Sequence, residues 1–320
     1  MLKISIIIPL YNKSPYILRA INSVLGQTEK SFEILVIDDG STDGGPEVIK
    51  NIKDSRIKLI QQANQGVSVA RNVGISESSA DLVAFLDADD AWKNNFLETV
   101  LRLKNRHPEA RAYSTAYEII ETDGTHSVFK YRGIPASPWE GVIPNYFKSA
   151  SSYYSPVWTS ATAISKEVFN IIGNFPAGER IGEDLDMWLR VALRYPVAFS
   201  NHVCASYFLR NKEEQLKGDK FYLCEYQMIR TAREALKSRR MLFRDKFYLN
   251  EYKNFYQLIL ALYCILTDEK QSAQSHLKDC RTFLYLWKKI VYLVLLNFPG
   301  VLTKRIIKLK QKIIRYLSAR

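Results

Sequence analysis

The stretch that decides the fold is "DLVAFLDADDAW", residues 81–92, where an apolar run ends abruptly in three aspartates. The run at 82–86 is short and has no polar alternation, which is typical of a strand that is buried on both faces. Carboxylates this close together repel one another and lose hydration together. We therefore expect either a cation or solvent to meet the end of this strand.

The first 90 residues repeat the same plan of strand followed by helix. The patterns predict strands at 3–12, 31–45, 56–62 and 80–90, and helices at 14–28, 46–53 and 66–78. This alternation predicts an α/β fold with a mostly parallel sheet and helices on both faces. Ligands bind such sheets at the carboxyl ends of the strands. Three polar clusters lie at these ends and are expected to share one crevice: Tyr11 with Asn12, Asp38 with Asp39, and Asp87 with Asp89.

The rest of the chain is more helical. We expect a helix at 94–108, a strand at 110–124, a loop, strand and short helix within 151–173, and a helix at 182–196. The first turn of that last helix holds Glu183 and Asp184. Residues 221–280 are predicted to form two helices. The expected domains are an α/β domain at 1–212, a helical extension at 213–280 and a basic amphipathic tail at 281–320.

Composition excludes several classes of protein. The chain has 320 residues, 47% hydrophobic and 24% charged, which is ordinary for a globular protein. Ten of its 45 Lys and Arg lie in 281–320, which has no acid, so the remaining 35 nearly balance the 33 Asp and Glu. A nearly neutral body argues against nucleic-acid binding. The four scattered Cys lack metal-site spacing and are expected to be free thiols in a reducing compartment.

The tail has the composition of a membrane-surface segment. The apolar stretch 283–302 is broken by Lys288, Lys289 and Pro299, and what remains is shorter than the roughly 20 residues of a span. Residues 303–320 place apolar side chains on one helical stripe among Lys and Arg, as interfacial helices do. We expect peripheral docking on the anionic cytosolic face of the membrane. A helix that covers the protein's own surface is the alternative.

No phosphate-binding glycine motif of the GxxxxGK[ST] or GxGxxG type is present. If a phosphate group binds, a divalent cation held by carboxylates would neutralise it, and Mg²⁺ or Mn²⁺ accepts one or two carboxylates plus phosphate oxygens. Asp87 and Asp89 alternate along the chain, so in an extended strand they would point to the same side. The alternative is a solvated turn that merely ends the strand.

Five ordered segments carry a resemblance to a known family: "SIIIPLYNK", "EILVIDDGSTD", "NQGVSVARNVGI", "FLDADD" and "GEDLDMWLR". Over about residues 1–200 the chain resembles the family 2 glycosyltransferases, which have the GT-A fold. The resemblance implies an inverting transfer of one sugar from a nucleotide-sugar, with UDP-sugar favoured, since the QxxRW motif of processive members is missing after Asp184. It also implies Mn²⁺ or Mg²⁺ and a glycan acceptor, lipid-linked as in bacterial O-antigen or polysaccharide assembly.

The resemblance also implies roles for single residues. Residues of the nucleotide-sugar site would be Pro9, Tyr11, Asp38, Asp39, Arg71 and Asp87. Tyr11 would stack on a uracil, Arg71 would lie near the diphosphate, and Asp89 would be the principal metal ligand. Asp184 would be the catalytic base, and Trp158 and Glu183 would lie near the acceptor, although a core position for Trp158 is equally consistent with the sequence.

Other classes of function remain open from the sequence. A sugar-phosphate nucleotidyltransferase would share the sheet and the metal, but "PLYNKSPY" lacks the Gly-rich loop with Arg that we expect of it. A non-catalytic, membrane-associated nucleotide-binding protein would keep the fold without the reaction. A phospho-acceptor receiver domain would explain Asp38 and Asp39, but not the two later acidic motifs.

Overall fold

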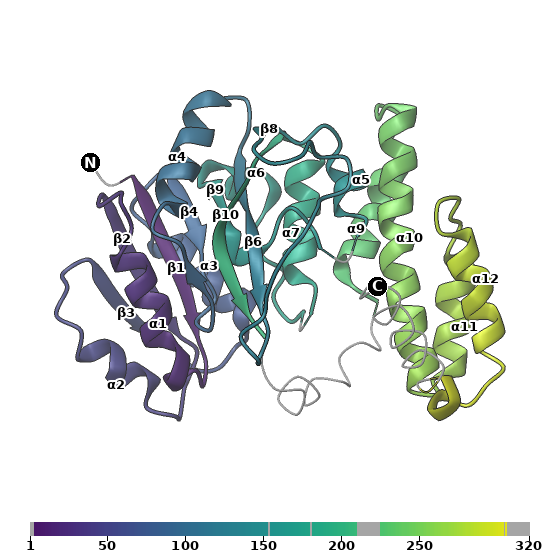
Figure 1. Cartoon of the computed structure of the whole chain (residues 1–320), viewed down its shortest axis with the longest axis horizontal. Coiled ribbons are helices and arrows are strands. Elements are labelled where there is room, and N and C mark those ends of the chain that lie inside the picture. The colour runs from purple at the N-terminus through teal and green to yellow at the C-terminus, as the bar shows by residue number, and fades with distance from the viewer. Residues whose placement is uncertain (1–2, 153, 180, 210–224, 304, 306–320) are drawn as a thin grey trace. The chain divides into compact units, whose positions relative to one another are not determined.

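The computed structural model describes residues 3–152, 154–179, 181–209, 225–303 and 305. The chain divides into two compact units, Met1–Lys217 (unit 1) and Gly218–Arg320 (unit 2). Each unit is described below by itself (Figure 1).

Unit 1 is built on a ten-stranded mixed sheet. Its strands are β1 (Ile4–Leu10), β2 (Phe32–Asp38), β3 (Ile57–Gln61), β4 (Leu82–Phe85), β5 (Ala91–Trp92), β6 (Ala112–Ile120), β7 (His126–Val128), β8 (Glu140–Val142), β9 (Thr162–Ser165) and β10 (Val197–Phe208). The order β3-β2-β1-β4 is parallel throughout, as the sequence predicts. Beyond β4, the strand β9 runs antiparallel to both β4 and β6, and β10 lies parallel to β6. Two short strands, β7 and β8, pair with β6 and β10 off the main path.

The helices of unit 1 cover both faces of this sheet. They are α1 (Ser14–Leu25), α2 (Gly45–Lys50), α3 (Val67–Glu77), α4 (Phe96–Arg106), α5 (Tyr146–Ala150), α6 (Glu167–Ile172) and α7 (Glu183–Ala192). Figure 1 shows α1 and α3 on opposite faces of the parallel strands. Burial of β1 and β2 from both sides explains why their sequences are continuous apolar runs. It also brings the carboxyl ends of β1, β2 and β4 to one edge of the sheet.

Besides the short strands β5, β7 and β8, which were not predicted, two elements of the sheet differ from the sequence prediction. The fourth strand ends at Phe85 rather than at residue 90, because residues 87–90 form a turn in which the Asp90 N–H donates to the Asp87 carbonyl oxygen over 3.0 Å. The twelve-residue strand β10 was not predicted. Its pairing with β6 shifts register on both sides of Val203, and this irregularity interrupts the alternation by which a strand is recognised in sequence.

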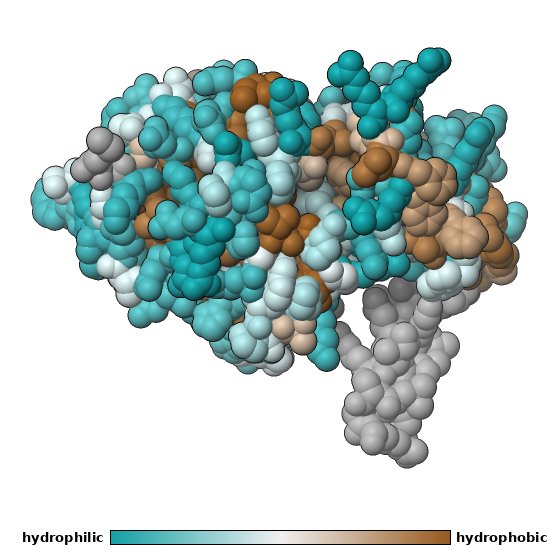
Figure 2. Space-filling model, turned by 90° about the horizontal axis from the view of Figure 1, so that it is seen from above, coloured by the Kyte–Doolittle hydropathy of each residue, from teal (hydrophilic) through white to brown (hydrophobic). Residues whose placement is uncertain are grey.

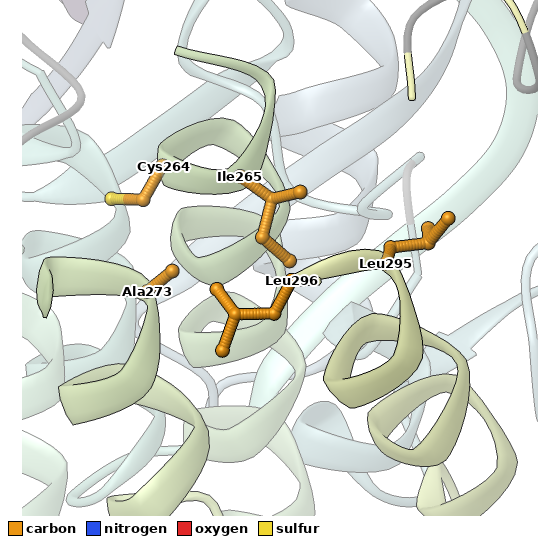
Figure 3. Close-up of a cluster of buried hydrophobic side chains, with 5 residues drawn as sticks. All are labelled: Cys264, Ile265, Ala273, Leu295 and Leu296. Atoms are coloured by element: carbon orange, nitrogen blue, oxygen red, sulfur yellow. The ribbon is translucent and has the colours of Figure 1, made fainter. Parts of the chain in front are cut away.

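Unit 2 is helical in its described part. It contains α9 (Gln227–Leu236), α10 (Phe243–Leu266), α11 (Lys270–Asp279) and α12 (Leu286–Leu295), so described residues up to 280 hold three helices rather than the predicted two. A buried cluster joins α10, α11 and the end of α12 (Figure 3), and its members are Cys264, Ile265, Ala273, Leu295 and Leu296. The thiols of Cys204, Cys264 and Cys280 are free and buried, as expected, and Cys224 lies outside the described residues. Within the described ranges, no helix combines the length and apolar character needed to cross a membrane.

We predict that Gly74→Ala lowers the free energy of unfolding by about 1–3 kcal/mol. A Cβ at Gly74 would lie 2.5 Å from Cγ2 of Ile7, a buried side chain of β1. Helix α3 would therefore have to move away from the sheet. Urea denaturation of the purified protein measures the change, with Ser76→Ala on the exposed side of the same helix as the control. Equal stability of the two variants would contradict the close packing of α3 on β1.

Candidate functional site

Each of the three aspartates in the 87–90 turn has a partner from another part of the chain, which offsets the repulsion between their charges. Asp87 accepts a hydrogen bond from Arg71 of α3 over 2.9 Å, and Asp89 forms an ion pair with Lys13 at 3.1 Å. The buried Asp90 accepts a hydrogen bond of 2.7 Å from the Ser160 hydroxyl. Burial, followed by the neighbouring Asp87 charge, raises the pKa of Asp90 well above its ordinary value. The turn is therefore balanced by the chain itself.

A second cation fixes the backbone of the same turn. The Arg19 guanidinium of α1 donates to the Asp89 carbonyl oxygen over 2.5 Å and lies 3.5 Å from the centre of the Phe208 ring. Burial lowers the pKa of Arg19, while Asp90 acts in the opposite direction. Lys13 and Arg19 thus attach the beginning of α1 to the turn.

Arg71 connects the two acidic motifs. Its buried guanidinium donates one hydrogen bond to the Glu183 carboxylate over 2.7 Å and another to the Asp87 carboxylate over 2.9 Å. Asp87 and Glu183 lie far apart in the sequence. The ring of Phe175 lies beneath it, 5.3 Å away. Although burial acts to lower the pKa of Arg71, the carboxylates around it raise the pKa overall, so Arg71 stays charged. A buried cation with two carboxylate partners fixes the end of β4 against the first turn of α7.

Asp184 lies beside this ion pair network at the first turn of α7. One carboxylate oxygen accepts a hydrogen bond from the Thr159 hydroxyl over 3.0 Å, and the other accepts from the Leu185 N–H over 2.8 Å. Part of the residue reaches solvent, yet the protein atoms packed around the carboxyl, followed by the Glu183 charge, raise its pKa to about 6. Arg71 opposes this shift. A carboxylate with a pKa near neutrality is suited to accept a proton.

Asp38 and Asp39 form the polar end of β2, and both are buried. The Asp38 carboxylate accepts hydrogen bonds from the Ser41 N–H and the Gln61 side chain, each at 3.0 Å. Asp39 accepts from the backbone N–H groups of Gln65 and Gly66 at 2.9 and 2.8 Å, at the start of α3. These bonds fix the loops that follow β2 and precede α3, and the nucleotide-binding role of both residues stays a prediction.

The remaining predicted residues lie around the same edge. Pro9 is half-buried near the end of β1, and the side chain of Tyr11 directly after this strand is 48% exposed. Trp158 packs in an aromatic group with Tyr117 and Tyr207, at ring-centre distances of 4.6 and 5.3 Å. The next residue in sequence, Thr159, donates a hydrogen bond to Asp184, the predicted base.

A metal ion is compatible with part of this arrangement. No group of three His, Cys, Asp or Glu side chains suited to a metal occurs in the described ranges. Mg²⁺ and Mn²⁺ sites built on one or two carboxylates need no such group, because substrate phosphate oxygens and water complete the coordination. Asp87 and Asp89 lie two residues apart in a turn, and their side chains are 32% and 16% exposed. The donor set therefore fits an ion that arrives with a phosphate ligand rather than a preformed cage.

Sequence reasoning missed four residues that hold the site together: Lys13, Arg19, Thr159 and Ser160. Lys13 carried a usable signal, since it follows the first strand directly within "PLYNK". Thr159 and Ser160 lie in a 3-10 turn, Thr159–Ala161, and no sequence pattern links this turn to acids 25 and 70 residues away.

The fold defines a class, the α/β proteins with the GT-A architecture. Residues 1–349 of TarS from S. aureus, crystallised in complex with UDP-GlcNAc, superpose with a TM-score of 0.67 at 20% identity, over 87% of this chain and 80% of that one. Residues 5–149 match the family model described as "Glycosyl transferase family 2". Over residues 5–149 the chain is thus similar to the family 2 glycosyltransferases, which confirms the resemblance found in the sequence.

Relatives with curated descriptions agree with this assignment. An uncharacterised glycosyltransferase of Rickettsia bellii is 33% identical over 194 residues, which is 60% of this chain and 26% of the relative. TuaG of Bacillus subtilis, described as a putative teichuronic acid biosynthesis glycosyltransferase, is 36% identical over 125 residues, 38% of this chain and 49% of TuaG. The chain spans 26–30% of the length of the Rickettsia bellii protein and of two similar glycosyltransferases from Rickettsia conorii and Rickettsia felis.

We predict that Arg71→Met lowers the free energy of unfolding by about 3–5 kcal/mol, because it leaves two carboxylates without their shared buried cation. Lys58→Met is the matched control, since Lys58 also forms a 2.7 Å ion pair, with Glu77, but on the surface. The control should cost less than about 1 kcal/mol. Chemical denaturation measures both values. A cost for Arg71→Met no greater than that of the control would show that Arg71 does not hold the two motifs together.

Proposed function

We propose that this protein transfers one sugar from a nucleotide-sugar, a UDP-sugar in the first instance, to a hydroxyl of a glycan acceptor with inversion at the anomeric carbon. The observation that carries the proposal is the position of Asp184. This carboxylate has a pKa of about 6 and lies beside the Arg71 network that reaches Asp87. The proposed base and the acidic 87–90 turn are thus linked through Arg71 at one edge of the sheet. The family 2 match and the fold shared with TarS support the same reaction class.

The reaction is a single displacement. The acceptor oxygen forms a bond to the anomeric carbon as the bond from that carbon to the diphosphate oxygen breaks, and the hydroxyl proton passes to the Asp184 carboxylate. The Thr159 hydroxyl and the Leu185 N–H each donate to one oxygen of Asp184 and so fix the direction of the carboxylate. Trp158, beside Thr159, offers an aromatic surface for the acceptor sugar.

The donor nucleotide is proposed to bind along the ends of β1 and β2. The exposed ring of Tyr11 provides a stacking surface for the base, and the hydrogen-bonded Asp38 and Asp39 order the surrounding loops. Pro9 precedes this rim within β1. Arg71, buried and charged, supplies positive potential close to Asp87 where the diphosphate would lie.

Asp89, with Asp87, would hold Mn²⁺ or Mg²⁺, and a bound ion would stabilise the negative charge that grows on the departing diphosphate. Lys13 now pairs with Asp89, so this lysine would lie beside both the ion and the phosphate oxygens. The match to TuaG, which is described as a putative glycosyltransferase of teichuronic acid biosynthesis, supports a bacterial polysaccharide as the acceptor class, and a lipid-linked acceptor is part of the proposal.

Asp184→Asn should lower the rate of sugar transfer by about 10²–10⁴-fold and leave nucleotide binding unchanged. In the unaltered protein, kcat/KM should fall as pH decreases through about 6, because only the ionised carboxylate accepts the proton. Release of UDP from UDP-sugars in the presence of acceptor measures both effects. Asp186→Asn is the control, since Asp186 pairs with Arg190 at 2.7 Å, and it should keep the same pH dependence. A fully active Asp184→Asn would place the base elsewhere.

Asp89→Ala should weaken Mn²⁺-dependent binding of UDP, because it removes the carboxylate that would share the ion with the diphosphate. Calorimetric titration with UDP, with Mn²⁺ and then with EDTA, measures the difference. The exposed Asp123→Ala serves as the control and should bind as the unaltered protein does. If both variants bound UDP equally well, or if EDTA did not weaken UDP binding, the proposed metal site at Asp89 would be wrong.

A further inference from the structure

Helix α12 presents its apolar side to solvent. Ten hydrophobic residues on and around it are exposed, and we call them the α12 face: Phe283, Leu286, Trp287, Ile290, Val291, Leu293, Val294, Phe298, Val301 and Leu302. Their exposed fractions run from 39% for Phe298 to 76% for Phe283. In the space-filling view, hydrophobic residues gather at the right-hand end, over the helices of unit 2 (Figure 2). Large exposed apolar patches mark interaction sites rather than ordinary surface.

The polarity of α12 is reversed relative to a helix that packs on a globular core. Its two lysines lie toward the unit rather than away from it: Lys288 lies 5.3 Å from the Tyr285 ring centre and 5.6 Å from that of Phe255, and Lys289 donates to the Cys280 carbonyl oxygen over 2.7 Å. Positions that normally carry charge on a solvated helix face are therefore apolar here.

The orientation of α12 is fixed at both ends by buried polar groups. Before the helix, the carboxylate of the buried Glu251 accepts hydrogen bonds from the Thr282 hydroxyl and from the N–H groups of Phe283 and Leu284, at 2.6–3.0 Å. After the helix, the Gly300 N–H donates a hydrogen bond to the Asp268 carboxylate over 2.7 Å. Leu295 and Leu296 anchor the helix in the buried cluster of unit 2. These contacts keep the α12 face turned outward.

We propose that the α12 face docks on a lipid surface with anionic headgroups. The apolar side chains would enter the boundary between headgroups and acyl chains, as those of interfacial helices do. Charge selects this occupant, because residues 281–320 contain no acid and, besides Lys288 and Lys289, eight Lys and Arg. Basic residues near an anionic surface strengthen binding to it. A second copy of the chain would instead bring two such basic segments together, which like-charge repulsion disfavours. The proposal does not depend on the transfer reaction.

The test is co-sedimentation of the full chain with vesicles of phosphatidylcholine alone and of phosphatidylcholine mixed with phosphatidylglycerol. The unaltered protein should bind the mixed vesicles, and high salt should weaken this binding. Combining Ile290→Glu with Val294→Glu should reduce the partition coefficient by about tenfold or more, because two charges would have to enter the apolar boundary. Both side chains are more than half exposed, so the fold should tolerate the change.

The matched control combines Ile171→Glu with Val128→Glu, which changes residues of similar exposure, 50% and 60%, in unit 1. This variant should bind vesicles as the unaltered protein does. Equal loss in both variants, or no loss in the α12 variant, would overturn the proposal. If the unaltered protein bound phosphatidylcholine vesicles as well as the mixed vesicles, the requirement for anionic headgroups would be wrong. If the unaltered protein formed a dimer that the α12 substitutions alone dissociated, the α12 face would bind a second copy of the chain instead. UDP release in solution, measured on the same samples, reports separately on the proposed function.

Discussion

The site depends on one buried cation. Arg71 donates to Asp87 at the end of β4 and to Glu183 at the start of α7, and so joins two acidic motifs that the chain supplies separately. A buried charge is tolerated only when it is paired and hydrogen-bonded, and the buried Glu183 carboxylate has the same need. Because Asp184 follows Glu183, the contact that stabilises this edge of the sheet also places the proposed base.

Charge balance around the 87–90 turn gives the site its chemical character. Lys13 and Arg71 pair with carboxylates of the turn, and Arg19 donates a hydrogen bond to its backbone. A metal with a diphosphate ligand would therefore join an arrangement that is already balanced, with Lys13 close enough to face the phosphate oxygens. Asp184 lies where burial and Glu183 raise its pKa and Arg71 lowers it, and this opposition leaves the pKa in the range useful for a base.

Much of the fold was predictable, because it rests on local patterns. Continuous apolar runs gave β1, β2 and β4, and the Ser14 and Pro15 pair marked the start of α1. The register shifts that interrupt β10 hid that strand, and the turn at residues 87–90 replaced the expected extended end of β4. In the site, the acids at 38–39 and 87–90 were found because they follow strands, whereas the roles of Glu183 and Asp184 came from the family resemblance. Partners such as Ser160 could not be found, since their contacts with Asp90 depend on tertiary packing across 70 residues.

The most direct test of this account is a double-mutant cycle on unfolding free energy with Arg71→Met, Glu183→Gln and the combined variant. If the buried pair joins the two motifs, the effects will not add, and the coupling energy should be about 1.5 kcal/mol or more. Additive effects, with a coupling energy near zero, would show that the β4 end and the first turn of α7 are held together by something other than Arg71, and the central claim would be wrong.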